Sequence, residues 1–252
     1  MRRAVALAAA LAPLAGAAQE TVHPWELRVE GAYENLDNGQ PDWNEALAQL
    51  AWKPRKDFTL LGAARTTERF DQRDREGVAA AYVPLGDKGP VLHLEGTLSS
   101  THKVLARDSA LAELAQPLGA GWVVTGGAKY SRYDTGNVTI GSATVEKYFG
   151  DYRLGYTVYI SRLEGASWTP AHRLAASWYR GALTYVTLSG AKGREVENVF
   201  PQPLRVTDVS AVSLAGGLEL TPTWGLTAEA LYVRQGDLYT RRGARLGTRI
   251  LF

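Results

Sequence analysis

The chain ends in the segment Ala244-Arg245-Leu246-Gly247-Thr248-Arg249-Ile250-Leu251-Phe252. Side chains alternate between the two faces of a β-strand, so one face of this segment carries the apolar residues and the terminal Phe252, and the other carries Arg245 and Arg249. Such a strand suits a wall between lipid and a wet interior, because the strands of outer-membrane barrels run apolar-out and polar-in. The segment therefore predicts the last strand of a bacterial outer-membrane β-barrel.

The same segregation of charge onto one face recurs along the chain. In the first predicted strand Glu26, Arg28 and Glu30 alternate with large apolar residues. A slip of one residue would turn these charges toward lipid, where an arginine or lysine costs about 2–4 kcal/mol at the bilayer midplane. The side chains that we predict to line the interior are Arg28, Glu30, Arg65, Glu95, Lys129, Arg153, Arg173, Glu219, Glu229, Arg245 and Arg249.

Large aromatic residues gather at the ends of the predicted strands. Aromatic belts lie at the water–lipid boundary of membrane proteins, whereas a soluble β-sandwich or lipocalin-like barrel, the alternative fold, would bury such rings in mid-strand. The predicted belt beside the short turns comprises Trp25, Trp52, Trp122, Tyr152, Trp178, Trp224 and Phe252. A second belt near the loops would comprise Tyr33, Trp43, Tyr130 and Tyr232.

Alternation and turn signals predict an all-β, closed antiparallel up-and-down barrel of about fourteen strands. We place these strands near 23–35, 43–53, 57–69, 76–85, 90–100, 104–117, 121–133, 138–149, 151–163, 170–180, 183–192, 206–220, 224–235 and 242–252. Twelve strands is the alternative, with 76–85 and 183–192 misread. Turns are short on one rim and looser on the other, where Phe70 to Arg75 and the longest loop, Gly193 to Arg205, are expected.

The N-terminal sequence predicts a secretory signal peptide over residues 1–18, followed by the barrel over residues 19–252. A basic start precedes the apolar run Ala4 to Ala18, with cleavage expected after Ala17 or Ala18. The alternative is a buried helix or a membrane anchor, but Pro13 interrupts the run and an anchor needs about 20 residues. The leader contains Arg2 and Arg3 and no acidic residue, so its removal lowers the formal net charge from +2 to 0. A neutral chain gives no indication of nucleic-acid binding.

The stretch Glu146-Lys147-Tyr148-Phe149-Gly150-Asp151-Tyr152-Arg153-Leu154-Gly155-Tyr156, followed by Val158-Tyr159-Ile160, resembles the central hairpin of the YaiO-type outer-membrane β-barrel family. The terminal Arg249-Ile250-Leu251-Phe252 and the overall size fit the same family. The resemblance implies an outer-membrane location and provides no catalytic motif. Related barrels are fused to periplasmic repeat domains in cellulose-export channels, and this sequence has no helical-repeat segment, which argues against an autonomous exporter.

Catalytic and metal-binding patterns are weak. The chain has four histidines and no cysteine, which excludes thiolate metal sites. No His-x-Ser pair would share a strand face, and His102 near Ser99 or Ser100 is the remaining candidate for nucleophilic catalysis. No two histidines have metal-ligand spacing. In the loop after Phe70 acids alternate with arginines, which favours a solvated loop over a calcium site. We predict no enzyme activity, no cofactor and no metal.

Three functions fit this sequence. The first is a passive pore, or an export or envelope-polysaccharide-associated barrel with a charge-lined interior; the alternative is that these charges pair across the barrel and plug it. The second is a surface receptor, adhesin or assembly partner that uses a loop with Val199-Phe200-Pro201-Gln202-Pro203 at its tip. The third is a lipid-modifying enzyme dependent on His102. The expected partners are outer-membrane lipid, the barrel-assembly machinery through the strand ending in Phe252, and envelope polysaccharide machinery.

Overall fold

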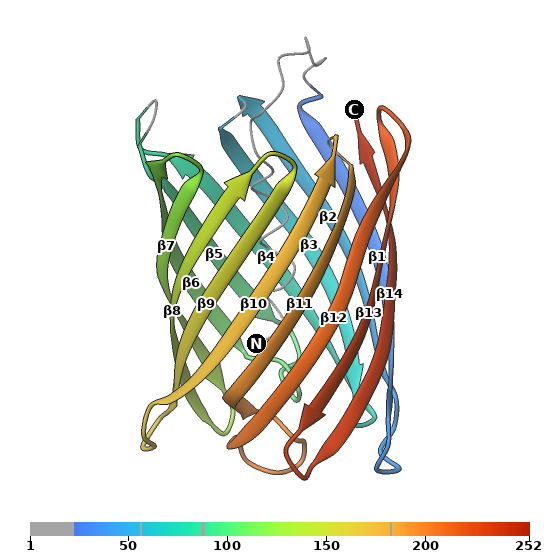
Figure 1. Ribbon diagram of the computed structural model, residues 1–252. Coiled ribbons are helices and arrows are strands. Elements are labelled where there is room, and N and C mark those ends of the chain that lie inside the picture. Colours follow the sequence, from blue (N-terminus) through green and yellow to red (C-terminus); the bar gives the residue numbers. More distant parts are fainter. Residues whose placement is uncertain (1–22, 56, 87–88, 182) are drawn as a thin grey trace.

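The computed structural model describes residues 23–55, 57–86, 89–181 and 183–252 and forms one closed antiparallel barrel (Figure 1). The predicted signal peptide, residues 1–18, lies outside the described residues. The fourteen strands are β1 (Trp25–Leu36), β2 (Trp43–Arg55), β3 (Phe58–Arg69), β4 (Gln72–Pro84), β5 (Val91–Ser99), β6 (Asp108–Gly119), β7 (Trp122–Tyr133), β8 (Gly136–Phe149), β9 (Tyr152–Leu163), β10 (Thr169–Arg180), β11 (Thr184–Glu197), β12 (Arg205–Thr221), β13 (Trp224–Gln235) and β14 (Tyr239–Leu251).

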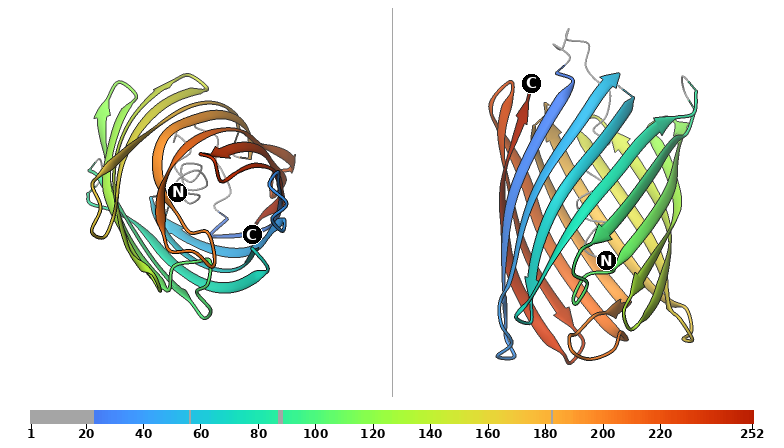
Figure 2. Two further views of the ribbon diagram at one scale, coloured as in Figure 1. Left: turned by 90° about the horizontal axis from the view of Figure 1, so that it is seen from below. Right: turned by 180° about the vertical axis from the view of Figure 1, so that it is seen from behind.

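Strands β1 and β14 pair and close the barrel. Arg28 lies opposite Arg249 in this ladder, and Trp25 and Phe252 exchange two backbone hydrogen bonds of 2.9 Å. Closure leaves no unpaired strand edge. The hydrocarbon core of a bilayer holds no water that could bind the free N–H and C=O groups of such an edge. The prediction of fourteen strands is confirmed, including both strands that the twelve-strand alternative left out. Because the number is even, the chain enters β1 and leaves β14 at the same rim (Figure 2).

The two rims differ in their connections. At the rim where β14 ends, short turns join the strands, and Gly150 (φ 56°) and Gly181 (φ 80°) supply the left-handed conformation that such turns require. At the opposite rim the connections include 37–42, 100–107, 164–168 and 198–204. Short turns lie on the periplasmic side of outer-membrane barrels. We therefore call these the periplasmic rim and the outer rim.

Three predicted boundaries at the outer rim were wrong. The Phe70 to Arg75 loop is a two-residue turn, because Gln72 to Arg75 continue the ladder between β3 and β4. The Gly193 to Arg205 loop shrinks to 198–204, because β11 and β12 pair as far as Glu197 and Arg205. The strand predicted from 104 begins at Asp108, and 100–107 is a loop. Polar residues beyond the bilayer keep their ladder hydrogen bonds, which sequence polarity does not reveal.

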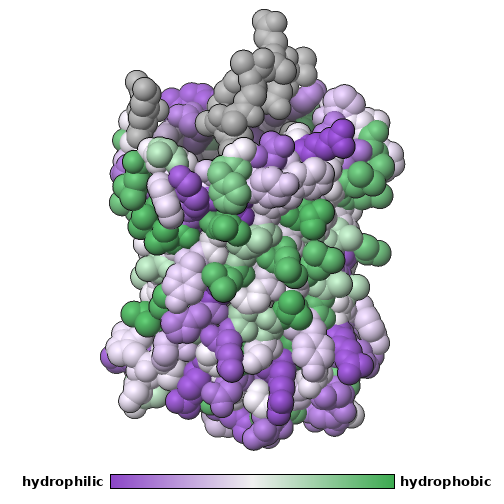
Figure 3. All heavy atoms as spheres, in the orientation of Figure 1, coloured by the Kyte–Doolittle hydropathy of each residue, from purple (hydrophilic) through white to green (hydrophobic). Residues whose placement is uncertain are grey.

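The barrel is apolar outside and charged inside. Leu98 is 71% exposed and Leu246 is 68% exposed, whereas Glu30 is 5% exposed and Arg153 is 4% exposed. On the face that Figure 3 shows, apolar side chains form a band across the middle of the outer surface, with polar side chains toward the rims. The described chain has no helix long and apolar enough to cross a membrane. The exposed apolar band is the surface that faces lipid.

Candidate functional site

A chain of opposite charges runs along the inner wall from β13 through β14, β1, β2 and β3 to β4. Arg245 contacts Glu45 at 2.8 Å, Glu30 at 3.3 Å and Glu229 at 3.9 Å. Arg65 continues the chain, at 3.8 Å from Glu45 and paired with the next acid along the wall. We call this set the charge ladder: Arg28, Glu30, Glu45, Arg65, Glu76, Glu229 and Arg245.

The ladder charges pair along the wall. Arg28 and Glu30 pair within β1, and every other pair of the ladder joins neighbouring or next-neighbouring strands. The same holds near the periplasmic rim, where Glu26 contacts Arg249 at 2.8 Å and pairs with Lys53. Unpaired charges would be costly in this position, whereas pairs with good geometry offset their desolvation. Among the described residues these ion pairs therefore hold neighbouring strands together and do not reach across the barrel.

The other part of the wall, from β5 to β12, is built from hydroxyl groups. Cross-strand pairs join Thr97 to Ser109 at 2.8 Å and Thr144 to Thr157 at 2.9 Å. The inward parity of these strands also carries tyrosines, and β4 contributes one more at their edge. We call this surface the hydroxyl wall: Thr97, Ser109, Thr144, Thr157, Ser161, Thr169, Ser177, Thr187, Ser189 and Ser213, with Tyr82, Tyr148, Tyr159, Tyr179 and Tyr185.

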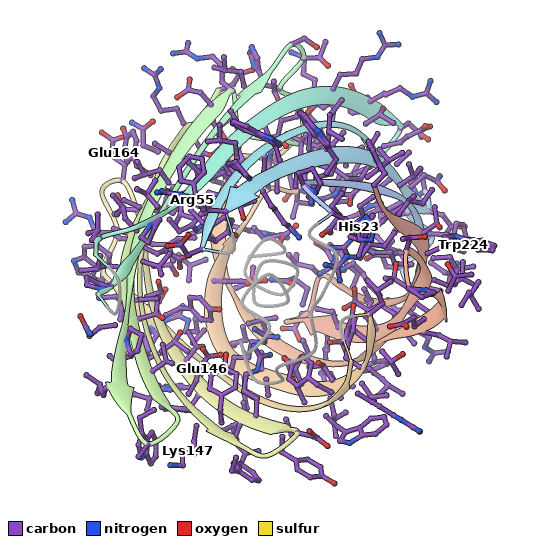
Figure 4. All side chains as sticks on the ribbon, turned by 90° about the horizontal axis from the view of Figure 1, so that it is seen from above. His23, Arg55, Glu146, Lys147, Glu164 and Trp224 are labelled. Carbon is purple, nitrogen blue, oxygen red and sulfur yellow. The ribbon has the colours of Figure 1, made fainter. Side chains whose placement is uncertain are left out.

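Charged groups are embedded in the hydroxyl wall. Arg153 contacts Glu146 at 3.3 Å and donates to the Ser177 hydroxyl at 3.1 Å, and Arg173 is buried on the next strand. Figure 4 shows Glu146 on the inner side of the barrel and Lys147 on the outer side. The wall thus combines many neutral hydroxyls with a few charges of both signs.

A histidine group lies at the edge of the hydroxyl wall. The imidazole of His93 stacks on Tyr82, with ring centroids 4.3 Å apart and planes within 8°. Its Nδ1 lies 3.1 Å from a carboxylate oxygen of Glu113. Glu95, two residues along β5, is buried on the same face.

An apolar cluster, which we call the outer cap, lies at the outer rim. It comprises Leu36, Trp43, Phe70, Val104, Leu105 and Tyr239, with Val199, Phe200 and Leu238 packed against it. Trp43 lies at its centre, with its ring centroid 5.2 Å from Phe70 and 5.5 Å from Tyr239. The guanidinium groups of Arg69 and Arg241 lie over the same indole at 4.6 and 4.7 Å.

The prediction for Trp43 was wrong. This residue was expected in an aromatic belt facing lipid, but it points inward and is 2% exposed. Trp43 points inward because it lies two residues before the inward Glu45 on β2 and therefore shares its strand face. The other members of that predicted belt, Tyr33, Tyr130 and Tyr232, are exposed on the outer surface.

Polar contacts hold the loops of the outer cap in place. The fully buried carboxylate of Asp74 accepts backbone N–H bonds from Lys103 at 3.1 Å, Val104 at 2.7 Å and Leu105 at 2.8 Å. The side-chain amide of Asn198 donates to the backbone oxygen of Lys103 at 3.2 Å. The loops 100–107 and 198–204 are thereby joined to each other over the barrel mouth.

The predicted interior residues occupy different parts of this wall. Arg28, Glu30, Arg65, Glu229 and Arg245 belong to the charge ladder, and Arg249 pairs with Glu26. Arg153 and Arg173 lie in the hydroxyl wall, where Glu95 and Lys129 share the inward parity. Glu219 lies exposed near the periplasmic rim.

The predicted aromatic belt lies on the outer surface at the periplasmic rim. Trp25 and Trp52 stack with ring centroids 6.1 Å apart, and the indole N–H of Trp224 donates to Thr248 at 2.7 Å. Figure 4 shows Trp224 on the outer side of the barrel. Trp122, Tyr152 and Phe252 are exposed, and Trp178 is half-buried.

The candidate catalytic histidine has an acidic neighbour. His102 Nδ1 lies 2.7 Å from Asp134 in the turn between β7 and β8. The Ser100 hydroxyl donates to the backbone oxygen of Arg75 at 3.4 Å. In the part of the chain that the structure describes, no three His, Asp or Glu side chains are placed to hold a metal ion.

Sequence reasoning missed the residues of the outer cap. Val104 and Leu105 were assigned to the start of a strand and Phe70 to a loop, and no periodic pattern links the three. Asp74 was assigned to a solvated loop on account of its arginine neighbours. The available signal was the adjacent apolar pair Val104-Leu105, which does not alternate as a barrel strand requires.

Comparisons with known proteins agree with the geometry. Residues 26–198 match the model of the YaiO membrane beta barrel domain. Solved structures with the same fold include Acinetobacter baumannii Omp33 (TM-score 0.55, 12% identity, covering 90% of this chain and 98% of that one). They also include a bacterial polysaccharide outer membrane secretin (0.55, 10%, 92% and 99%) and a KdgM porin (0.51, 8%, 89% and 99%). No curated protein matched by sequence.

Proposed function

Because this chain belongs to the YaiO family of outer-membrane β-barrels, we propose that it passes acidic, hydroxylated solutes of the oligosaccharide type, with the outer cap closing the barrel at rest. The observation that supports the proposal is that the inner wall has two parts, the charge ladder and the hydroxyl wall. The charge ladder satisfies its own charges, whereas the hydroxyl wall offers groups that exchange partners readily.

The hydroxyl wall suits sugars chemically. Serine and threonine hydroxyls both donate and accept hydrogen bonds, so a sugar hydroxyl can replace a neighbouring side chain without leaving a group unpaired. Tyrosine rings such as Tyr159 and Tyr179 provide flat surfaces with a polar edge. Arg173, and Arg153 beside Glu146, provide guanidinium groups that can bind a carboxylate. A barrel of fourteen strands lies between the eight-stranded barrels that side chains fill and the 16–18-stranded barrels that hold an aqueous channel.

Other proteins of the same fold give this proposal context. One KdgM porin structure is described in complex with disordered oligogalacturonate (TM-score 0.50, 8% identity). At this identity the likeness concerns the fold, and the proposal for this chain rests on its own wall residues.

Passage of a solute requires the outer cap to open. Its buried apolar side chains cover the outer mouth, and a solute passes only when the loops 100–107 and 198–204 separate. We therefore expect the wild-type barrel to be closed most of the time in a bilayer.

Planar-bilayer recording tests the proposal. The double variant V104D/L105D places charges in the cap and should show frequent conductance steps, which oligogalacturonate should reduce more than a neutral maltooligosaccharide of the same length. Adding R173Q should weaken this block. The matched control L118D changes an exposed leucine at the periplasmic rim and should behave as the wild type. Absence of steps in a cap variant that still shows a heat-modifiable gel shift would refute the pore.

The receptor interpretation stays a prediction. Within the loop 198–204, Val199 and Phe200 pack against the outer cap, while Pro201, Gln202 and Pro203 are exposed. A partner would therefore meet the three exposed residues, and their deletion should abolish partner capture. The lipid-modifying interpretation also stays a prediction, and it requires loss of activity in H102A.

A further inference from the structure

Exposed cations gather on the outer surface of the barrel near the outer rim. They lie on the outward parity of their strands, beyond the apolar band. On the face that Figure 3 draws, a polar zone lies at the lower part of the barrel, where the outer rim is. The corresponding outward positions at the periplasmic rim carry aromatic residues such as Trp25 and Trp122. The cations at the outer rim are Arg73, Arg75, Arg132, Arg162, Lys192, Arg194, Arg234 and Arg242.

Several of these cations are already partnered by the protein. Arg73 contacts Glu68 at 2.6 Å, Arg132 contacts Asp108 at 2.6 Å, and Arg194 lies 3.7 Å from Asp208. Arg162 lies over the ring of Trp168 at 5.5 Å. The pairs of Arg73 and Arg132 and the ring contact of Arg162 lie on the face formed by β3 to β10, whereas the Arg194–Asp208 pair joins β11 to β12.

The face formed by β11 to β14 differs. Lys192, Arg234 and Arg242 are exposed there, and among the described residues none of the three makes an ion pair within 4.0 Å of a carboxylate. Arg242 helps to lower the pKa of Asp37, but the first cause of that shift is a hydrogen bond from Thr240. Oδ1 of Asp37 accepts the Thr240 N–H at 2.7 Å.

The strand register brings the three cations together. Lys192 pairs with Ser210, which pairs with Arg234, so the two cations lie about 10 Å apart at a strand spacing of about 4.8 Å. Arg242 lies opposite Tyr232, two residues from Arg234 along β13, a diagonal separation of about 7–8 Å. We call Lys192, Ser210, Arg234 and Arg242 the cation patch.

The cation patch borders the apolar band directly. Two residues further toward the middle of the barrel, the outward positions of β12, β13 and β14 are occupied by Val212, Tyr232 and Ala244. The next outward positions on β12 and β14 are Leu214 and Leu246. A cation costs about 2–4 kcal/mol at the bilayer midplane and about 0–1 kcal/mol near the interface. The patch therefore lies at the depth of lipid headgroups, with exposed tyrosine beside it as in interfacial belts.

We propose that the cation patch binds the phosphate groups of a phosphorylated glycolipid of the outer leaflet, that is, lipopolysaccharide. Guanidinium and ammonium groups at this depth meet phosphates, with which arginine forms paired charge-assisted hydrogen bonds. The acyl chains of the same molecule cover the adjacent Val212, Leu214 and Leu246. A single ligand thus satisfies both the charge of the patch and the apolar surface beside it. This proposal is independent of what passes through the interior.

Titration of the refolded full chain with purified lipopolysaccharide tests the proposal. The readout is the temperature at which the barrel loses its heat-modifiable gel mobility. The patch variant is K192Q/R234Q/R242Q, and the matched control R73Q/R75Q/R132Q removes the same number of charges from β4 and β7. Each variant is first checked for the gel shift of a folded barrel, and R234Q alone replaces the triple variant if that one does not fold.

Lipopolysaccharide should raise the transition temperature of the wild type and of the control. Three contacts of the strength of exposed ion pairs correspond to about ten-fold in apparent affinity, so the patch variant should require about ten times more ligand, and R234Q about two- to three-fold more. Enzymatically dephosphorylated lipopolysaccharide should bind the wild type as weakly as it binds the patch variant. Equal affinity for patch variant and wild type, an equal loss in the control, or equal binding of phosphatidylglycerol would overturn the proposal.

Discussion

The carboxylate of Asp74 on β4 accepts the backbone N–H of Leu105 at 2.8 Å. The same carboxylate also binds the N–H groups of Lys103 and Val104. A strand of the barrel wall thus fixes the position of a loop that lies over the outer mouth, and the apolar side chains of that loop complete the outer cap.

Replacing this carboxylate should release the loop. In Asp74→Ala three backbone donors lose their charged acceptor, and hydrogen bonds to charged groups contribute about 1.5–3 kcal/mol each. We expect faster hydrogen exchange and faster proteolysis within residues 100–107, with an unchanged barrel core. Asp71→Ala is the control, because Asp71 is exposed in the neighbouring turn. Equal exchange in both variants would mean that Asp74 does not hold the loop.

Trp43 should contribute to stability through the cap and not through lipid contact. Truncation of a buried large aromatic residue costs about 3–5 kcal/mol, so Trp43→Ala should lower the free energy of unfolding in urea by that order. Tyr130→Ala, which removes an exposed ring from the outer surface, should have a smaller effect. A larger loss of unfolding free energy in Tyr130→Ala than in Trp43→Ala would contradict the buried position of Trp43.

The lipid-facing surface can be tested with two exposed leucines. Leu174 lies in the middle of β10 and Leu118 lies at the end of β6, and they are 65% and 63% exposed. Arginine costs about 2–4 kcal/mol at the bilayer midplane and about 0–1 kcal/mol near its edge. Leu174→Arg should therefore destabilise the barrel in lipid far more than Leu118→Arg. Similar unfolding free energies for the two would argue against a membrane at this depth.

The contact between Asp37 and Thr240 should depend on pH. The hydrogen bond from the Thr240 N–H lowers the pKa of Asp37, so the carboxylate stabilises the folded loop above its unfolded pKa of about 3.9, and this stabilisation is lost as the pH falls through the lower folded value. The exchange protection of the Thr240 amide should decrease below about pH 4. Asp37→Asn should remove this pH dependence, and a wild-type protection that stays constant to pH 2 would contradict the assignment.

The strand pattern was predictable and the outer cap was not. Charges such as Glu26, Arg28 and Glu30 keep one parity, and each would face lipid after a one-residue slip, so local sequence determines the register. The cap depends instead on contacts distant in sequence, such as the one between Asn198 and Lys103. The ends of the strands at the outer rim were misplaced because polar residues such as Asp74 occur equally in loops and in ladders beyond the bilayer.

The central claim is that the hydroxyl wall lines the solute path beneath the outer cap. Because the chain has no cysteine, Ser213→Cys in the wall and Leu214→Cys on the lipid face can each be introduced into the V104D/L105D barrel. We predict that a charged, membrane-impermeant thiol reagent reduces the single-channel conductance of the Ser213→Cys barrel and leaves that of the Leu214→Cys barrel unchanged. An unchanged conductance in both barrels, or an equal reduction in both, would contradict the account.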